Sequence, residues 1–284
     1  MTATGLRRLA LLILVAGSLP CRGVGAADEN AVTIHYIAHA SFVLTGPGGT
    51  RLLLDPYADR VWLGYDFPAN IQADAVFSTH PHYDHDGGLF IGRTPEWKGR
   101  MPLYSEPGVV RLGGFVVHGF KGRHAPPYGK EFGYKNTVFV FQAAGLTLVH
   151  IGDNEALKAG LAEKIGRADI LMLPIDGNAH LLSFAAIDAY ANAIQPRILI
   201  PMHYRIGDLE PDPEKPKGLG GIDPWLATQR HVIHLSGNTA TLRKQTLPAE
   251  RQIWVFAHAP ELHPPHRAPN SPAGPSMTHH GEAR

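Results

Sequence analysis

One short turn of the chain concentrates residues that bind protons and metal ions. The segment STHPHYDHDGG, residues 78–88, places three histidines and two aspartates within seven positions of a chain whose charged residues make up only 18%. Residues two apart point to the same side of an extended segment, so His80, His82 and Asp84 can converge. His85 follows at a bend. Buried His and Asp side chains cost several kcal/mol unless paired or metal-bound, so the turn is predicted to form a metal centre.

The available ligand types limit the kind of metal site. Cys21 is the only cysteine, and it lies in an N-terminal segment with the features of a signal peptide. A mature domain would therefore have no disulfide and no thiolate. Histidine, aspartate or glutamate must then bind any metal, which excludes cysteine-based structural zinc sites and favours a catalytic or hard-metal site.

The pattern H-x-H-x-D-H over residues 80–85 resembles the signature of the metallo-β-lactamase superfamily. The resemblance covers roughly residues 31 to 204. YIAHASF and LLLDPY look like the opening strands of the branch that includes ascorbate-6-phosphate lactonase and N-acyl-phosphatidylethanolamine phospholipase D. GRHAPPYG, HIGDNE, LPIDG and IPMHY then follow in the order of that branch. The implied fold is of the α/β (α+β) class, a four-layer αββα sandwich with metals at one edge of the sheets.

The resemblance implies seven metal ligands at motif positions: His80, His82, Asp84, His85, His124, Asp153 and His203. The first two histidines and His124 would hold one ion. Asp84, His85 and His203 would hold the other, and a carboxylate at Asp153 would bridge them. Such ligands suit Zn²⁺, expected as two ions per chain, and also tolerate Mn²⁺ or Fe. Asp84 is also expected to be catalytic, orienting a metal-activated water and moving its proton.

The three ligands outside the turn have competing interpretations. His118 and His150 are alternatives to His124, which we prefer because Ala-Pro-Pro after it makes an irregular loop. The other two histidines lie in apolar, strand-like runs. Asp153 follows an apolar run whose end can present a carboxylate, but it is also a candidate helix N-cap. For His203, which follows a predicted strand, the alternative is a buried histidine with ordinary hydrogen bonds.

Further polar residues are expected around these ligands. His39 and Asp55 are expected to hydrogen-bond to them, because a metal-bound imidazole commonly donates its other N–H to a carboxylate. Asp55 before a proline is equally typical of a turn. Asp176 and His180, in PIDGNAH, are expected on the substrate side. There His180 would be a catalytic hydrogen-bond donor to the substrate or transition state, or else an ordinary loop histidine.

Two groups of side chains are candidates for substrate contact. The aromatic residues of DPYADRVWLGYDFPAN either form an apolar wall beside the metals or pack on the domain: Tyr57, Trp62, Tyr65 and Phe67. Three basic residues could engage a phosphate or carboxylate, or be ordinary exposed cations: Lys121, Arg123 and Arg205. The chain has no G-x-S-x-G nucleophile motif and no G-x-x-x-x-G-K-[ST] phosphate loop.

Short apolar runs between turn signals predict the strands that position these motifs. Residues 31–55, interrupted by Gly-Pro-Gly-Gly, predict a meander, and further strands are predicted over 74–79, 137–142, 146–151, 169–173 and 197–201. Apolar spacing predicts helices within 152–166, capped by Asp153 or Asn154, and over 183–194. Strands followed by strands interleaved with helices suit two packed sheets with helices outside.

The two ends of the chain differ from the domain between them. Residues 1–26 combine Arg7 and Arg8, an apolar run over 9–16 and small residues, as in a secretory signal peptide. The apolar run is about half of the roughly 20 residues that a membrane span needs. We therefore expect an exported, periplasmic or secreted hydrolase domain over 27–258, with an uncleaved anchor as the alternative. Residues 259–284, rich in Pro, Gly, Ser and His, are predicted to be a disordered tail.

Composition narrows the function further. A formal net charge of +1 and the lack of a clustered Lys/Arg face argue against nucleic-acid binding. The expected function is metal-dependent hydrolysis of a small ester, lactone, amide or phosphodiester. A phospholipase D-like phosphodiesterase acting on membrane lipid and a non-catalytic metal-binding protein are the alternatives. A redox enzyme of this fold would need a carboxylate in place of His82 and a flavin domain, and the sequence has neither.

Overall fold

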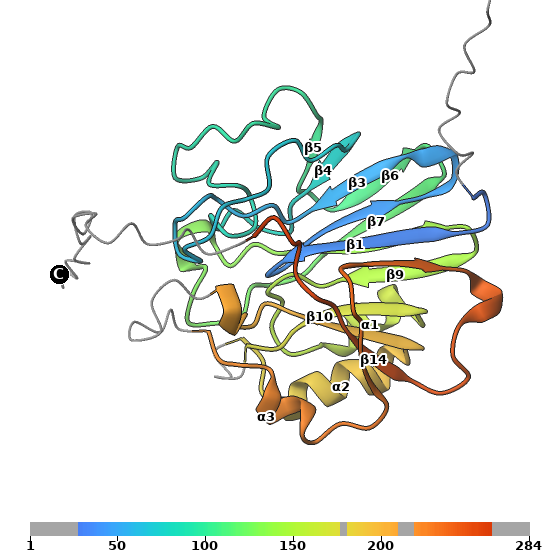
Figure 1. Cartoon of the computed structure of the whole chain (residues 1–284). Helices are drawn as coiled ribbons and strands as arrows, with labels where there is room; N and C mark the ends of the chain where they lie inside the picture. Colours follow the sequence, from blue (N-terminus) through green and yellow to red (C-terminus); the bar gives the residue numbers. More distant parts are fainter. Residues whose placement is uncertain (1–27, 177–180, 210–218, 263–284) are drawn as a thin grey trace, which may run out of the picture.

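A computed structural model describes residues 28–176, 181–209 and 219–262 of the chain (Figure 1). The predicted signal peptide over 1–26, His180 and residues 263–284 lie outside the described residues. Within the described part, no helix is long and apolar enough to cross a membrane.

Two sheets form the centre of the fold. The first has the strand order β13-β1-β2-β3-β4-β5, with the bounds β1 Val32–Ala38, β2 Ser41–Thr45, β3 Arg51–Leu54, β4 Ala75–Phe77, β5 Leu103–Tyr104 and β13 Thr239–Leu242. The second has the order β12-β14-β11-β10-β9-β8-β7-β6, with the bounds β6 Gly108–Leu112, β7 Phe115–Lys121, β8 Thr137–Ala143, β9 Leu146–His150, β10 Ile170–Pro174, β11 Ile198–Met202, β12 Val232–His234 and β14 Gln252–Val255. Each individually predicted strand is present within two residues of its expected ends. β5, β6 and β12 to β14 were not predicted.

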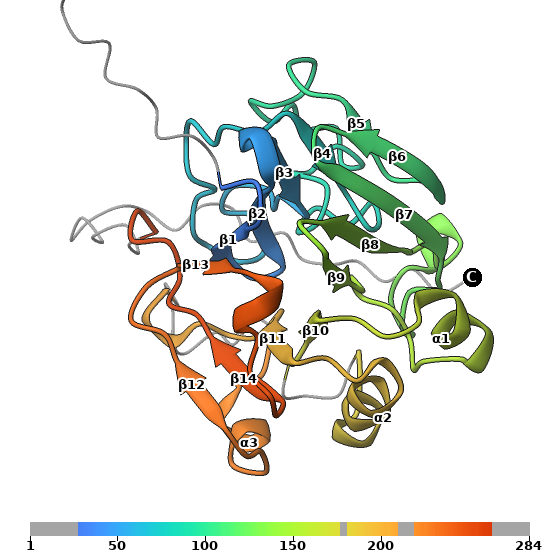
Figure 2. The same cartoon turned by 90° about the vertical axis from the view of Figure 1, so that its right-hand side faces the viewer.

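The helices lie on the second sheet. They are α1 Ala159–Ile165, α2 Phe184–Ile194 and α3 Asp223–Leu226, with short 3₁₀ turns η1 Pro47–Gly49, η2 Lys130–Phe132, η3 Gly207–Leu209 and η4 Lys244–Thr246. Figure 2 shows α1 and α2 on the same side of this sheet. The predicted N-terminus of α2 is confirmed, since the Ser183 hydroxyl accepts from Ala186 N at 3.2 Å. The predicted cap of α1 is wrong: the helix begins after Lys158, and the Asn154 side chain instead accepts from Arg123 N.

Three apolar layers hold the sandwich together. The two sheets face each other across a core that includes Phe42, Phe77 and Phe141. Ile187 and Tyr190 of α2 cover the other face of the second sheet. Burying each such side chain stabilises the fold by about 1.5–3 kcal/mol. The αββα sandwich is thus confirmed in its two sheets and one helical layer.

The outer face of the first sheet is covered differently. Among the described residues it is covered by loop side chains, such as Tyr57 and Trp97, rather than by α-helices. The chain from 55 to 102 contains five prolines and five glycines, which interrupt helices by removing donors and adding backbone freedom. This half of the sandwich therefore has a loop layer.

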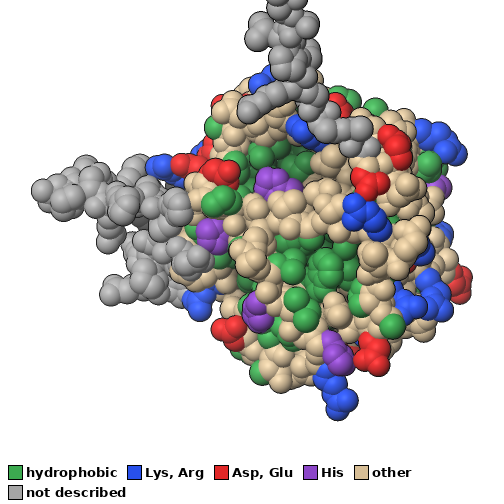
Figure 3. Space-filling view, turned by 45° about the vertical axis from the view of Figure 1, so that its right-hand side comes forward, with side chains coloured by type: hydrophobic (Ala, Val, Ile, Leu, Met, Phe, Trp, Pro, Cys, Tyr) green, Lys and Arg blue, Asp and Glu red, His purple; other side chains and the backbone are tan. Residues whose placement is uncertain are grey.

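The described chain ends on this loop layer. Ala259 N donates to Ile37 O at 2.8 Å, and Ala259 and Leu262 are both buried. The predicted start of the tail at 259 is therefore wrong by at least four residues, because this apolar pair packs on the sheet. On the face in Figure 3, acidic and basic side chains are interspersed around exposed hydrophobic ones.

Candidate metal centre

The histidine-rich turn lies where several strands of both sheets end. The turn 78–88 follows β4, and His39 lies between β1 and β2. His124, Asp153 and His203 come one to three residues after the ends of β7, β9 and β11. Loops at the ends of a rigid sheet can present polar groups without interrupting its hydrogen bonds. The sandwich therefore brings distant segments of the chain to one edge.

Eight side chains form two adjoining clusters at this edge. In each cluster, one potential ligand atom from every residue lies within 4.8 Å of the others: His80, His82, His124 and Asp153 in the first, and His39, Asp84, His85 and His203 in the second. We call the first the open cluster, because His82 is partly exposed, and the second the closed cluster, because all four residues are buried. The structure brings all seven predicted ligands together and adds His39.

Asp153 faces both clusters. One of its carboxylate oxygens lies 3.5 Å from His124 Nε2 and 3.3 Å from His203 Nε2. The other lies 3.4 Å from His85 Nε2. This residue is therefore placed where a bridging carboxylate is expected.

The two alternatives to His124 lie outside the clusters. His150 Nε2 donates to Ala40 O at 2.9 Å, and its Nδ1 accepts from Gly152 N at 3.2 Å, so both ring nitrogens are engaged. His118 lies in β7 beside the Phe120 ring, with 6.2 Å between centroids. Among the three candidates, only His124 belongs to a cluster.

Hydrogen bonds fix the rings of the open cluster. Thr79 Oγ1 lies 3.0 Å from His80 Nδ1, and His124 Nδ1 donates to the adjacent carbonyl oxygen at 2.6 Å. His82 Nε2 donates to Glu131 Oε1 at 2.9 Å. These bonds direct His80 Nε2, His82 Nδ1 and His124 Nε2 toward one another, with the first two 3.1 Å apart, where they could share an ion. Bonds of this kind set the tautomer and orientation of metal-binding imidazoles.

A buried carboxylate orients the closed cluster. Asp55 Oδ2 accepts from His85 Nδ1 at 2.7 Å and from Thr79 Oγ1 at 2.8 Å, while Oδ1 accepts from Thr79 N at 2.7 Å. His39 Nε2 lies 3.0 Å from Asp84 Oδ2. His39 and Asp55 therefore make the hydrogen bonds to ligands that the sequence predicted.

The donor set fits divalent cations. The Nε2 atoms of His85 and His124 are buried and make no hydrogen bond. The Asp153 oxygens lie 3.4 and 3.5 Å from them, beyond usual hydrogen-bond length. Leaving such groups unsatisfied costs about 1–3 kcal/mol each, a cost that coordination would remove. Imidazole nitrogens with carboxylate oxygens are the ligands of catalytic zinc and of several other transition metals.

Burial and mutual interaction set the charges of the centre. Burial and the neighbouring His203 lower the pKa of His39 to about 4, against the opposing effect of Asp84, so His39 is neutral at pH 7. Burial lowers the pKa of His203, but Asp153 and Asp84 raise it, and the balance is a pKa of about 9. Burial also opposes ionisation of the two aspartates, yet the adjoining histidines hold their pKa well below the usual value. Both carboxylates are thus ionised and ready to bind cations.

Three residues of the centre have strained backbones. The φ angles of His39, Asp55 and His203 are 57°, 40° and 56°, in the left-handed region that non-glycine residues rarely adopt. Each such residue costs of order 1–3 kcal/mol and persists only where its surroundings hold it. Here His203 N donates to His39 O at 3.0 Å, joining the ends of β1 and β11.

Aromatic side chains line the exposed side of the centre. The Phe132 ring lies 4.6 Å from that of His82, and the Trp62 ring lies 5.9 Å from that of His39. Burial raises the pKa of the Tyr83 hydroxyl to about 12, with smaller effects of nearby acidic groups, so it stays protonated and can donate. Tyr83, Glu131 and Phe132 were not among the residues predicted from the sequence. Only Tyr83 carried a signal, its place inside the H-x-H-x-D-H motif.

The other predicted substrate contacts are mostly elsewhere. Of the aromatic residues near 57–67, only Trp62 reaches the clusters, because Tyr57 packs against Tyr65 and Phe67 with centroids 5.3 and 5.0 Å apart. Arg123 donates to Glu155 at 3.1 Å and lies over the ring of Tyr134.

The remaining candidates are not members of either cluster. Asp176 is buried just beyond β10 and belongs to neither cluster. Lys121 and Arg205 are exposed. His180 lies outside the described residues.

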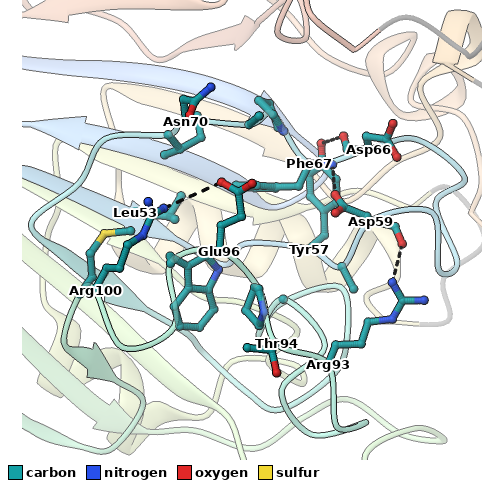
Figure 4. Close-up of a pocket in the computed structure, with 18 of the residues that line it drawn as sticks. Leu53, Tyr57, Asp59, Asp66, Phe67, Asn70, Arg93, Thr94, Glu96 and Arg100 are labelled. Carbon is teal, nitrogen blue, oxygen red and sulfur yellow. Dashed lines mark hydrogen bonds and ion pairs between the residues drawn. The ribbon is translucent and has the colours of Figure 1, made fainter.

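A cavity of about 660 Å³ lies apart from the metal centre, in the loop layer. Figure 4 shows Arg93 and Asp59 on one of its sides and the Glu96–Arg100 ion pair on another. None of the eight cluster residues lines it. Among its charged side chains, Glu96 pairs with Arg100, and Arg93 donates to the backbone carbonyl of Asp59.

Comparison with known proteins agrees with this geometry. Residues 33–203 match the family described as the beta-lactamase superfamily domain. A UPF0173 metal-dependent hydrolase from Thermoplasma acidophilum is 30% identical over 213 residues, which cover 68% of this chain and 92% of the relative. Another from Rubrobacter xylanophilus is 28% identical over 197 residues, covering 60% and 81%.

A solved structure shares the fold. A Thermotoga maritima protein, described as a candidate Zn-dependent hydrolase of the metallo-beta-lactamase superfamily, superposes with a TM-score of 0.58 at 24% identity. The match covers 79% of this chain and 98% of that protein. The narrower branch that the sequence resembles stays a prediction.

Proposed function

The chain belongs to the family of beta-lactamase superfamily domains, and from this premise we propose that it is an exported metal-dependent hydrolase of small esters or lactones. The relatives named as metal-dependent hydrolases support the class of reaction. The observation that carries the proposal is Asp153, whose two carboxylate oxygens face the open and the closed cluster. We propose two ions, one in each cluster, and zinc as the metal.

The side chains have separate tasks in this proposal. Bound divalent cations would lower the pKa of a bound water toward about 7, and would polarise the scissile carbonyl. Asp84 orients the attacking water and accepts its proton, since its carboxylate is ionised. Neutral His39 holds that carboxylate in place at 3.0 Å. Tyr83, whose ring lies 6.4 Å from that of His82 and whose hydroxyl stays protonated, is the candidate donor to the negative charge that develops on the substrate.

The contacts that Arg123 already makes favour an ester or lactone substrate over a phosphodiester. A phosphodiester keeps a negative charge, which enzymes commonly hold with arginine or lysine. Arg123, the candidate next to ligand His124, is already held by Glu155 and Tyr134. We therefore rank the phospholipase D-like reaction second and the non-catalytic metal-binding protein third.

The test combines metal analysis with a hydrolysis panel. Purified protein is analysed by mass spectrometry of its metals and then assayed on lactones, aryl esters, bis-p-nitrophenyl phosphate and β-lactams, before and after chelation. We expect about two equivalents of metal and ester or lactone turnover that chelation abolishes and zinc restores. Fastest turnover of the phosphodiester would favour the second reaction. Bound metal without any turnover would favour the third.

Export is proposed from the sequence of residues 1–26 alone. N-terminal sequencing of the protein recovered from the periplasm or medium of the producing cells tests it. Cleavage near Ala26 is the expected result, and an intact N-terminus in the cytoplasm would contradict it.

A further inference from the structure

Exposed apolar side chains adjoin the open cluster. The Phe132 ring lies 4.6 Å from that of His82, and the Phe90 ring lies 5.9 Å from that of Phe132. Phe90 is 54% exposed and its neighbour Ile91 is 49% exposed. We call Phe90, Ile91 and Phe132 the apolar platform.

The platform is tied to the metal-binding turn. Asp86, one residue after ligand His85, is buried and accepts from Gly88 N at 2.7 Å and from Phe90 N at 2.9 Å. These two bonds close the loop that carries Phe90 back onto the turn. The apolar side chains are thus held in place at the surface by a residue of the turn itself.

The other half of the platform is tied to His124. Phe132 lies in η2, between Gly129 and Gly133, whose φ angles are 89° and 70°. A side-chain carbon at Gly129 would lie 2.9 Å from the His124 ring, so this loop packs directly on a ligand. Both sides of the platform therefore have fixed positions relative to the open cluster.

Such exposure is unfavourable unless something covers it. Among the described residues, six large hydrophobic side chains are exposed, and three of them lie in these two loops: Phe90, Ile91 and Tyr128. Grouped exposed apolar residues mark binding sites more often than scattered ones do. The nearest functional feature is His82, the one partly exposed cluster residue. An occupant that reaches His82 and covers apolar surface is a substrate with an apolar part.

We propose that the substrate carries an uncharged alkyl or aryl group of several carbons beside its scissile ester bond, and that this group binds on the apolar platform. The inference rests on the proposed hydrolase function and names its substrate class. Glu131, which accepts from His82 at 2.9 Å beside Phe132, disfavours a negatively charged group at this position. An uncharged chain meets no such penalty and removes apolar surface from water.

The test measures how the rate depends on chain length. p-Nitrophenyl esters from acetate to octanoate, below their micelle concentrations, are hydrolysed by the metal-loaded protein. A fully buried methylene contributes about fourfold, so we expect kcat/KM to rise about twofold to fourfold per added methylene. Phe90→Ser should flatten this rise. Val109→Ser, at an exposed position of β6 outside the platform, should leave both the rise and the acetate rate unchanged.

A binding measurement without turnover separates this inference from the proposed function. In the metal-free protein, hexan-1-ol followed by NMR should bind several-fold more tightly than ethanol, and Phe90→Ser should remove the difference. Equal rates on all chain lengths would overturn the substrate class while the hydrolase function stands. If the metal-loaded protein hydrolyses none of the esters while the metal-free protein still binds hexan-1-ol more tightly than ethanol, the proposed function is overturned instead. A dimer of the unmodified protein that Phe90→Ser dissociates, with the chain-length dependence unchanged, would identify the platform as a subunit contact and overturn the inference.

Discussion

The open and closed clusters contain the same ligand chemistry but differ in their surroundings. In each cluster a carboxylate orients one histidine: Asp55 accepts from His85 at 2.7 Å, and Glu131 accepts from His82 at 2.9 Å. Asp55 is fully buried and is also held by Thr79, whereas the Glu131 side chain is 51% exposed. The same kind of bond is therefore fully buried in the closed cluster and exposed to water in the open cluster.

This difference indicates a division of roles. A buried hydrogen bond is electrostatically stronger and is not screened, while exposed pairs contribute only about 0–1 kcal/mol. The closed cluster is therefore suited to holding its ion firmly. The open cluster, with His82 at the surface beside the apolar platform, is suited to meeting the substrate. The predictions below test this asymmetry.

Removal of the Asp84 carboxylate should have the largest effect. Asp84→Ala takes away a closed-cluster ligand and the proposed proton acceptor, so we expect activity to fall about 10²–10⁴-fold. Metal content should fall from about two equivalents to about one, because the open cluster keeps its four residues. Asp66→Ala, at an exposed aspartate paired with Arg60, is the matched control. Full activity and two bound ions in Asp84→Ala would contradict the assignment.

Removal of the charge of Asp55, the buried carboxylate that orients His85, should have the second-largest effect. Asp55→Asn removes the charge that His85 faces and weakens the bonds from Thr79. Loss of such an orienting partner typically lowers metal affinity about 10–100-fold, and we expect this range for one of the two ions in a chelator competition. An unchanged affinity for both ions would show that the buried hydrogen bond between Asp55 and His85 does not contribute to metal binding.

The pH dependence of stability should separate the clusters in the metal-free protein. The pKa of His203 is about 9, above the 6.5 of an unfolded histidine, so the folded state binds its proton more tightly. This stability is fully present below pH 6.5 and is lost as pH rises through about 9. We expect urea unfolding to show a loss on the order of 1–3 kcal/mol across this window.

Two variants test which histidine causes this loss of folding stability at alkaline pH. His203→Gln should reduce it, because one titrating group is gone. His85, whose pKa burial lowers but Asp153 and Asp84 raise well above its usual value, keeps the remainder. His82→Gln should leave it unchanged, since burial lowers the pKa of this open-cluster histidine instead of raising it. An alkaline loss that is unchanged in His203→Gln and disappears in His82→Gln would reverse the proposed asymmetry.

The exposed orienting carboxylate should have the smallest effect. Glu131→Gln keeps an acceptor near His82 but removes the charge of a solvent-exposed pair. Such pairs contribute about 0.2–1 kcal/mol, so metal affinity should fall at most about fivefold. The same chelator competition used for Asp55→Asn measures it. A loss as large as that of Asp55→Asn would remove the distinction between the clusters.

Local patterns in the sequence predicted the strands that lead into the site. The apolar runs before Thr79, Asp153 and His203 appear as β4, β9 and β11, because period and turn signals act within a few residues. The strands β12 to β14 escaped prediction, since they are three or four residues long and half-exposed. The α1 cap was wrong because Asn154 has a partner in a distant segment, Arg123, which no local pattern reveals.

The spacing of histidines and aspartates within residues 80–85 determined that this chain would gather metal-binding groups at one turn, because neighbouring positions of an extended segment must lie close together. Only the tertiary structure decided which distant residues complete the centre. It engaged both nitrogens of His150, brought His39 to Asp84 and placed Glu131 and Phe132 at the exposed side. The physical reason is that burial and hydrogen-bond partners are set by packing between sheets and loops, which residues far apart in the sequence create together.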